Sequence, residues 1–113
     1  MTARLNIAAL APDLYKAVRA LDGAVGKSGL EPRLQHLVKL RASQINGCAY
    51  CVDLHVKEAL AQGIDAQTLH LVAVWRESPL FDTRDRAALD WTESVTLLAQ
   101  TGIPDADYDR VRQ

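Results

Sequence analysis

Two cysteines and a histidine stand at spacings that could support redox chemistry. Cys48 and Cys51 are three residues apart, and His55 follows four residues later. On a helix these spacings place all three side chains on one face, within reach of one another. Two thiols one helical turn apart have Cα atoms roughly 5–6 Å apart, the separation that a disulfide requires. The spacing therefore predicts a redox-active thiol pair with a base beside it.

The segment before the thiol pair favours a helix start. Asn46-Gly47 is a turn signal directly before Cys48. A helix that begins there presents unpaired N–H groups and the positive end of its dipole, and both lower a cysteine pKa below its reference of about 8.5. Cys51 also has His55 one turn further on, and the imidazole can accept its proton. We therefore expect Cys51 to attack a peroxide, Cys48 to resolve the sulfenic acid as a disulfide, and an external dithiol to reduce that bridge.

The composition indicates a folded and nearly neutral protein. Nearly half of the 113 residues are apolar, which argues against disorder, and the length suits one domain spanning residues 1–113. Thirteen basic and fourteen acidic residues almost cancel, so we expect no binding to nucleic acid or to an anionic membrane. The apolar stretches are too short to cross a bilayer, and the N-terminus lacks the apolar core of a signal peptide. These features predict a cytoplasmic protein.

Apolar residues recur at helical spacing, and nothing in the sequence reads as a strand. The first predicted helix begins at Pro12, and its apolar face carries Leu14, Val18, Leu21 and Val25. A second helix begins at Pro32 and runs to the Asn46-Gly47 turn, and a third covers about 48–62. The predicted fold class is therefore all-α, with about five to six helices.

Three further helical segments follow in the second half of the chain. Asp65 can cap a fourth helix that runs toward Trp75 and ends before Ser78-Pro79. Asp82 can cap a fifth. The expected apolar stripe of that fifth helix is Ala87, Ala88, Trp91, Val95 and Leu98. A sixth begins at Pro104 and has few residues left in which to bury a side chain.

The residues around the thiol pair resemble a known family. The sequence LRASQINGCAYC runs from Leu40 to Cys51 and is followed by His55, and the stretches WRESP (75–79) and AALDW (87–91) fit the same pattern. Together they resemble the carboxymuconolactone decarboxylase-like superfamily, specifically its AhpD-like alkylhydroperoxidase branch. The resemblance is closest over residues 34–55 and extends more loosely along the whole chain.

The resemblance implies an AhpD-like helical hairpin domain that assembles as a homo-oligomer, often a trimer or hexamer. It implies reduction of organic hydroperoxides without metal, haem or flavin, so no cofactor is expected. It makes Cys51 the peroxidatic cysteine, Cys48 the resolving cysteine and His55 the active-site histidine, in agreement with the spacing. Some relatives draw electrons from lipoyl-bearing or peroxiredoxin partners, so the expected partner is an external dithiol or lipoyl-type reductant.

The sequence departs from the family pattern in two places. The family usually has a glutamate twelve residues before the first cysteine, as part of a proton relay, and here that position is His36. A histidine, with a reference pKa of about 6.5, can still relay protons but cannot supply the same negative charge. We therefore include His36 among the candidate catalytic residues. Family domains also usually continue further, so we expect this chain to lack the family's C-terminal helices.

Three other functions compete with the peroxidase. The first is a metal-binding module of the Cys₂His₂ type, whose ligands would be Cys48, Cys51, His55 and His36. Against it, zinc modules usually take paired thiols from a knuckle rather than from along a helix. The second is a cofactor-free decarboxylase or lactone-handling enzyme, and the thiol pair would have no chemical role in such a reaction. The third is a non-catalytic helical assembly protein that retains the motif. Tyr50 and Trp91 are expected to be packing residues.

Overall fold

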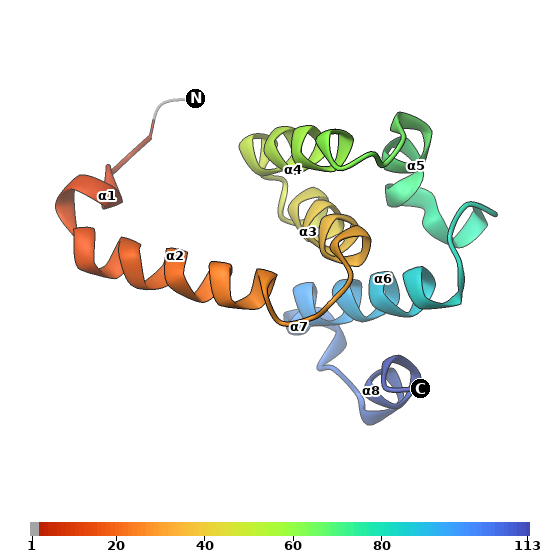
Figure 1. Cartoon of the computed structure of the whole chain (residues 1–113). Helices are drawn as coiled ribbons and strands as arrows, with labels where there is room; N and C mark the ends of the chain where they lie inside the picture. Colours follow the sequence, from red (N-terminus) through yellow and green to blue (C-terminus); the bar gives the residue numbers. More distant parts are fainter. Residues whose placement is uncertain (1–2) are drawn as a thin grey trace. The chain divides into compact units, whose positions relative to one another are not determined.

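The computed structural model describes residues 3–113, and every regular element in that range is helical (Figure 1). The range contains eight α-helices and one 3₁₀ helix, which confirms the all-α class. The six predicted segments are all present. The two additional helices, α1 and α7, have four residues each and are too short to show a hydrophobic period.

The chain divides into two compact units along the sequence: the first ends at Leu30 and the second begins at Glu31. The first holds α1 (Ile7–Leu10) and α2 (Pro12–Gly26). The side chain of Asn6 caps α1 by accepting the N–H of Ala9 at 3.2 Å, and a proline opens α2 at a position where its missing N–H costs nothing. None of the residues of α2 is buried.

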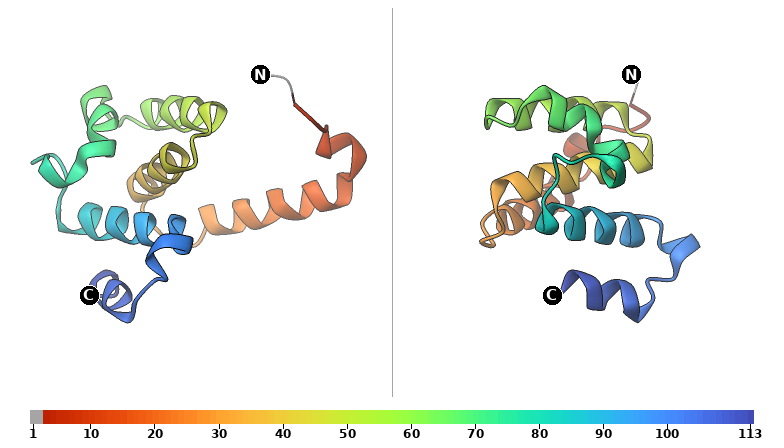
Figure 2. Two further views of the ribbon diagram at one scale, coloured as in Figure 1. Left: turned by 180° about the vertical axis from the view of Figure 1, so that it is seen from behind. Right: turned by 90° about the vertical axis from the view of Figure 1, so that its right-hand side faces the viewer.

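The second unit runs from Glu31 to Gln113 and is arranged around α3. Its elements are α3 (Pro32–Asn46), α4 (Ala49–Ala61), α5 (Ala66–Leu71), the 3₁₀ helix η1 (Val72–Glu77), α6 (Thr83–Thr96), α7 (Leu98–Thr101) and α8 (Asp105–Val111). One side of α3 packs against α4 and another against α6, as both views of Figure 2 show. The α3–α4 pair is the predicted helical hairpin.

The hydrophobic core of this unit comes from α3, α4, α5, η1 and α6, with Ile64 and Phe81 from the connections between them. Its largest fully buried side chains are Leu37, Leu40, Leu89 and Val72. The predicted stripe of α6 was wrong for Val95 and Leu98, which are 41% and 55% exposed. Val95 lies within α6, whose buried face carries Asp85, Leu89 and Thr92 instead, and Leu98 follows Leu97, where ψ is 32° and α6 ends.

Charged side chains hold α3 against α6 at two points. Arg33 of α3 donates to the buried carboxylate of Asp85 at 2.9 Å. Glu93 of α6 accepts hydrogen bonds from Trp75 Nε1 at 2.7 Å and from Arg41 Nε at 3.4 Å. Burial opposes ionisation of Glu93, but the hydrogen bonds from its neighbours prevail and hold its pKa below the usual range. These pairs fix the helix that carries His36.

The last helix packs on α6. The rings of Trp91 and Tyr108 lie 5.9 Å apart, and Ser94 Oγ donates to Asp107 at 2.6 Å. Arg110 joins the end of α8 to Asp90 at 3.1 Å. Trp91 is thus a packing residue, as predicted. In residues 3–113 no helix combines the length and the apolar character needed to cross a bilayer.

Candidate functional site

The turn between α3 and α4 positions the thiol pair. Gly47 ends α3 with φ at 67°, a left-handed conformation that glycine adopts without the strain of a Cβ atom. The N–H of Gly47 reaches Gln44 O and the N–H of Cys48 reaches Ser43 O, both at 3.1 Å. These bonds satisfy carbonyls at the end of α3, and the chain reverses into α4 within two residues. The predicted turn is confirmed, and it places Cys48 directly before the first residue of α4.

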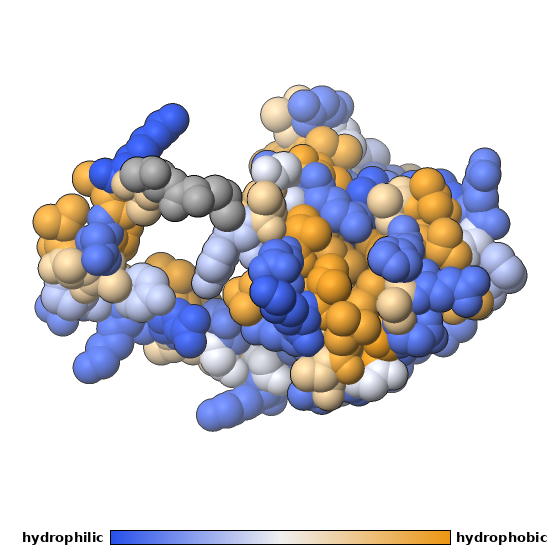
Figure 3. Space-filling model, turned by 90° about the horizontal axis from the view of Figure 1, so that it is seen from above, coloured by the Kyte–Doolittle hydropathy of each residue, from blue (hydrophilic) through white to orange (hydrophobic). Residues whose placement is uncertain are grey.

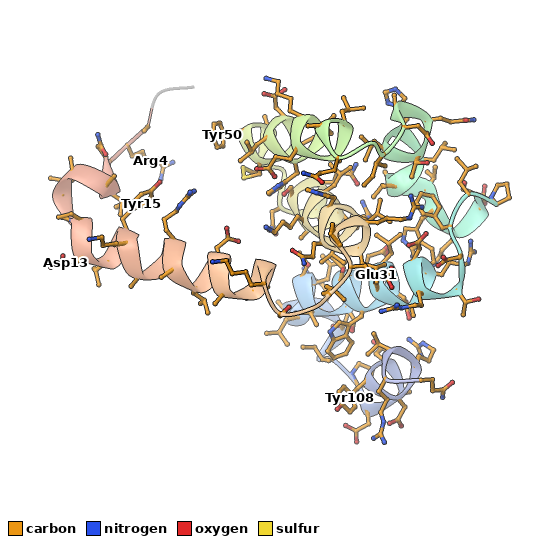
Figure 4. The ribbon with its side chains drawn as sticks, viewed as in Figure 1. Arg4, Asp13, Tyr15, Glu31, Tyr50 and Tyr108 are labelled. Carbon is orange, nitrogen blue, oxygen red and sulfur yellow. A yellow bond between two sulfur atoms is a disulfide. The ribbon has the colours of Figure 1, made fainter. Side chains whose placement is uncertain are left out.

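Cys48 is the N-cap residue of α4, and Cys51 lies in the first turn. The Cys48 backbone is extended, and its Sγ accepts the N–H of Cys51 at 3.2 Å. The two cysteines form a disulfide with their Cα atoms 5.2 Å apart, within the separation that the spacing predicted. The sulfur atoms lie at the start of α4 near Tyr50 (Figure 4). Both sulfurs therefore lie where the N-terminal N–H groups and the dipole of α4 favour a thiolate.

His55 lies one turn after Cys51 on the same face of α4, as the spacing predicted. Its side chain is 20% exposed, and its Nδ1 lies 3.1 Å from Oε2 of Glu58. Glu58 is on the same helix three residues further on. The histidine thus already has a carboxylate partner before any substrate arrives.

His36 contributes to this site from α3. Its Nδ1 is buried and has no hydrogen-bond partner among the described residues. Desolvation lowers the pKa of His36, the charge of Glu58 opposes that shift, and the charges of Lys39 and His55 add to it. His36 is therefore within electrostatic reach of the His55–Glu58 pair of α4, whereas Cys48, Cys51 and His55 all lie in the first two turns of α4 or at its cap.

Glu58 is the site residue that the sequence analysis missed. The signal for it was present, because a glutamate three residues after a histidine on a helix lies beside it. Tyr50 was placed wrongly for a different reason. It is 62% exposed and points away from the start of α4 (Figure 4), so it is not a packing residue within this chain.

The donor set proposed for a metal does not form in the described part of the chain. Across residues 3–113, no group of three or more His, Cys, Asp or Glu side chains is placed to hold a metal ion. The two sulfurs are bonded to each other, and Nδ1 of His55 lies at hydrogen-bond distance from the carboxylate of Glu58. The geometry favours a thiol–disulfide site over a Cys₂His₂ metal site.

An apolar pocket borders the same helix. It has a volume of about 290 Å³ and lies where α3, α4 and α5 meet. Its lining is Gln44, Val52, Val56, Leu60, Ala66, Leu69 and His70. The view from above, the side on which α4 lies in Figure 1, shows hydrophobic patches between hydrophilic ones (Figure 3). Two of the residues that line this pocket, Val52 and Val56, directly follow Cys51 and His55 in the sequence.

Comparison with protein families gives one match that covers most of the chain. The carboxymuconolactone decarboxylase family matches residues 12–94. This range includes the α3–α4 hairpin, the thiol pair and the capped start of α6.

Three individual proteins are similar to the chain. The uncharacterized protein YdfG of Bacillus subtilis (strain 168) is 31% identical over 113 residues, which are 100% of this chain and 77% of YdfG. The uncharacterized protein YnjA of Escherichia coli (strain K12) is 33% identical over 75 residues, which are 66% of this chain and 41% of YnjA. A crystal structure from Agrobacterium tumefaciens, of a protein of unknown function suggested to be an antioxidant defence protein AhpD, superimposes with a TM-score of 0.93 at 50% identity. That superposition covers 98% of this chain and 76% of the other.

Proposed function

Because this chain belongs to the carboxymuconolactone decarboxylase family and has the AhpD-like fold, we propose that it is a thiol-dependent peroxidase that reduces organic hydroperoxides. The observation that carries the proposal is the Cys48–Cys51 disulfide at the start of α4, one turn before His55. A thiol pair with this separation can release two electrons by forming a disulfide and take them up again when the disulfide is reduced. The family includes both decarboxylases and AhpD-like proteins, and the thiol pair favours the second.

The proposed cycle begins at Cys51. Its thiolate attacks one peroxide oxygen, the O–O bond breaks, an S–O bond forms, and the alkoxide takes a proton to leave as an alcohol. Cys48 then attacks the sulfur of the sulfenic acid, the S–S bond forms, and hydroxide leaves as water after protonation. An external dithiol supplies the two electrons that reopen the disulfide. His55 receives the proton of the Cys51 thiol, and a histidine so charged can return it to the leaving oxygen.

Substitution of each cysteine separately tests this assignment. With cumene hydroperoxide and dithiothreitol, Cys51→Ser should abolish peroxide consumption. With dithiothreitol removed, so that no external thiol can reduce a sulfenic acid, Cys48→Ser should still allow one oxidation, which stalls at a sulfenic acid visible as one added oxygen by mass spectrometry. The opposite result would reverse the two roles. A wild-type protein that keeps both thiols and gains no oxygen would end the peroxidase proposal, and zinc measured on the same sample would revive the metal-binding one.

His36 is proposed as a second proton carrier on the α3 side of the site. Desolvation lowers its pKa and favours the neutral imidazole, the form that can accept a proton, and its buried Nδ1 has no hydrogen-bond partner in the described part of the chain. Glu58, Lys39 and His55 are the charged groups that act on it. His36→Glu should extend peroxidase activity to lower pH, because a carboxylate stays ionised there. If His36→Ala leaves both the rate and its pH dependence unchanged, His36 is a packing residue.

A further inference from the structure

Glu58 has the geometry of a group that orients a catalytic base. We propose that Glu58 is a positioning residue that accepts the Nδ1–H of His55, and so leaves Nε2 as the nitrogen that takes the proton of Cys51. The site would then be a Cys51–His55–Glu58 triad on one helix. The catalytic part of this inference rests on the proposed peroxidase function, whereas the state of the His55 ring can be measured without any substrate.

The helix places the three groups together. Cys51, His55 and Glu58 follow one another at steps of four and three residues, so at about 100° per residue they fall within about 60° of each other around the helix axis. Oε2 of Glu58 lies 3.1 Å from Nδ1 of His55, a hydrogen-bond distance. His55 is therefore flanked by the thiol on its N-terminal side and by the carboxylate on its C-terminal side.

The bond to Glu58 selects one form of the neutral imidazole. A neutral histidine carries one ring proton, and its other nitrogen is the base. An ionised carboxylate can only accept, so the proton must lie on Nδ1. Nε2 then holds the lone pair that a thiol proton needs. The negative charge beside Nδ1 also stabilises the imidazolium that forms when the proton arrives, as the third member of a nucleophile–base–acid triad does.

Glu58 also acts electrostatically on His36 of α3. Its charge favours protonation of His36, whose desolvation does the opposite. The carboxylate itself is 45% exposed, and its hydrogen-bond distance is to His55. An exposed pair between neighbouring residues contributes little to stability, so a role in orienting the base is the better account of why it reaches this site.

Two variants of Glu58 separate orientation from charge. Glu58→Gln keeps an amide oxygen that can accept the Nδ1–H but removes the charge, whereas Glu58→Ala removes both. Asp53→Asn is the matched control, because Asp53 is an exposed carboxylate of the same helix that pairs with Lys57 at 2.7 Å. Long-range ¹H–¹⁵N spectra of the disulfide-bonded proteins, in which Cys51 has no proton to transfer, report near pH 8 which ring nitrogen of His55 carries the proton.

We expect the Nδ1–H form in wild type, Glu58→Gln and Asp53→Asn, and the Nε2–H form, which free imidazoles favour, in Glu58→Ala. The first oxidation of Cys51 by cumene hydroperoxide should slow about tenfold in Glu58→Ala and less in Glu58→Gln, a part of the 100-fold or more that a general base typically supplies. Asp53→Asn should react at the wild-type rate.

Two results would overturn the proposal: an Nε2–H ring in the wild type, or a Glu58→Ala variant that oxidises as fast as wild type. Failure of the peroxidase proposal would look different. The wild type would then consume no hydroperoxide, while the spectra would still show whether Glu58 sets the proton position on His55.

Discussion

The two units of the chain use the same helical pattern with opposite results. In α2, the apolar face of Leu14, Val18, Leu21 and Val25 is at least half exposed throughout. In the unit from Glu31 onward, Leu37 and Leu40 of α3 are completely buried. Both helices have 15 residues and begin with a proline. The comparison teaches that periodicity identifies the face of a helix that needs cover, but not what covers it.

The largest effect should come from the core of the second unit. Leu40→Ala should lower the free energy of unfolding by about 2–5 kcal/mol, because it leaves a cavity at a fully buried position. Urea denaturation followed by circular dichroism measures this loss. Ala17→Ser, on exposed α2, should change stability by less than about 0.5 kcal/mol. Equal losses at the two positions would erase the distinction between the units.

The next effect concerns the exposed face of α2. We propose that a second copy of the chain helps to cover this face, so that the protein is a homo-oligomer. Light scattering at micromolar concentration should give a mass well above the 12.4 kDa of one chain. Val18→Asp with Leu21→Asp should weaken association at least tenfold, which corresponds to about 1.4 kcal/mol.

Lys16→Glu is the control for that experiment, since it changes charge on the opposite face of α2 and should leave the mass unchanged. A compact wild-type monomer would contradict the proposal. It would also mean that the apolar face of α2 is exposed in solution.

A smaller effect is expected at the cap of α6, a helix that covers the core of the second unit. Asp82 accepts the N–H of Asp85 at 2.8 Å, and Asp85 reaches back to the N–H of Asp82 at 3.3 Å. Asp82→Ala should cost about 1 kcal/mol, and Asp82→Ser should restore most of it. The same substitution at Asp13 in the first turn of α2, where the carboxylate makes no cap, should cost less. Thermal unfolding of the three variants compares the two helix starts.

The smallest expected effect is on the pH dependence of stability, to which His36 of the second unit contributes. His36 of α3 has its pKa lowered from 6.5, mainly by desolvation, against the pull of Glu58 and with Lys39 and His55 adding to the shift. The unfolded chain therefore binds this proton more readily, so the stabilising contribution is present above pH 6.5 and is lost as the pH falls through the folded pKa. Between pH 7.5 and 5, His36→Gln should reduce the fall in melting temperature by about 2 °C.

His70→Gln, at an exposed position, controls for the removal of a histidine as such. If it reduces the pH dependence as much as His36→Gln does, burial of the His36 ring is not the cause.

The sequence alone determined the local features of the site. The spacing of Cys48, Cys51 and His55 predicted their shared face, and Asn46-Gly47 predicted the turn, because both depend only on helix geometry and on the backbone freedom of glycine. Caps at Asp65 and Asp82 were identified for the same reason. Local chemistry acts over three or four residues, and that range is visible in a sequence.

The tertiary structure alone decided which groups meet across helices. It brought His36 of α3 within the electrostatic influence of Glu58 on α4. It also buried Leu89 and left Val95 and Leu98 exposed, although the sequence predicted these last two for the buried face. A helical period leaves the neighbouring helix unspecified, so it cannot say which face of α6 is buried, and the end of α6 at Leu97 separates Leu98 from the rest of the predicted stripe. The pKa of His36 follows from the same packing, because desolvation depends on every group around the ring and not on its neighbours in sequence.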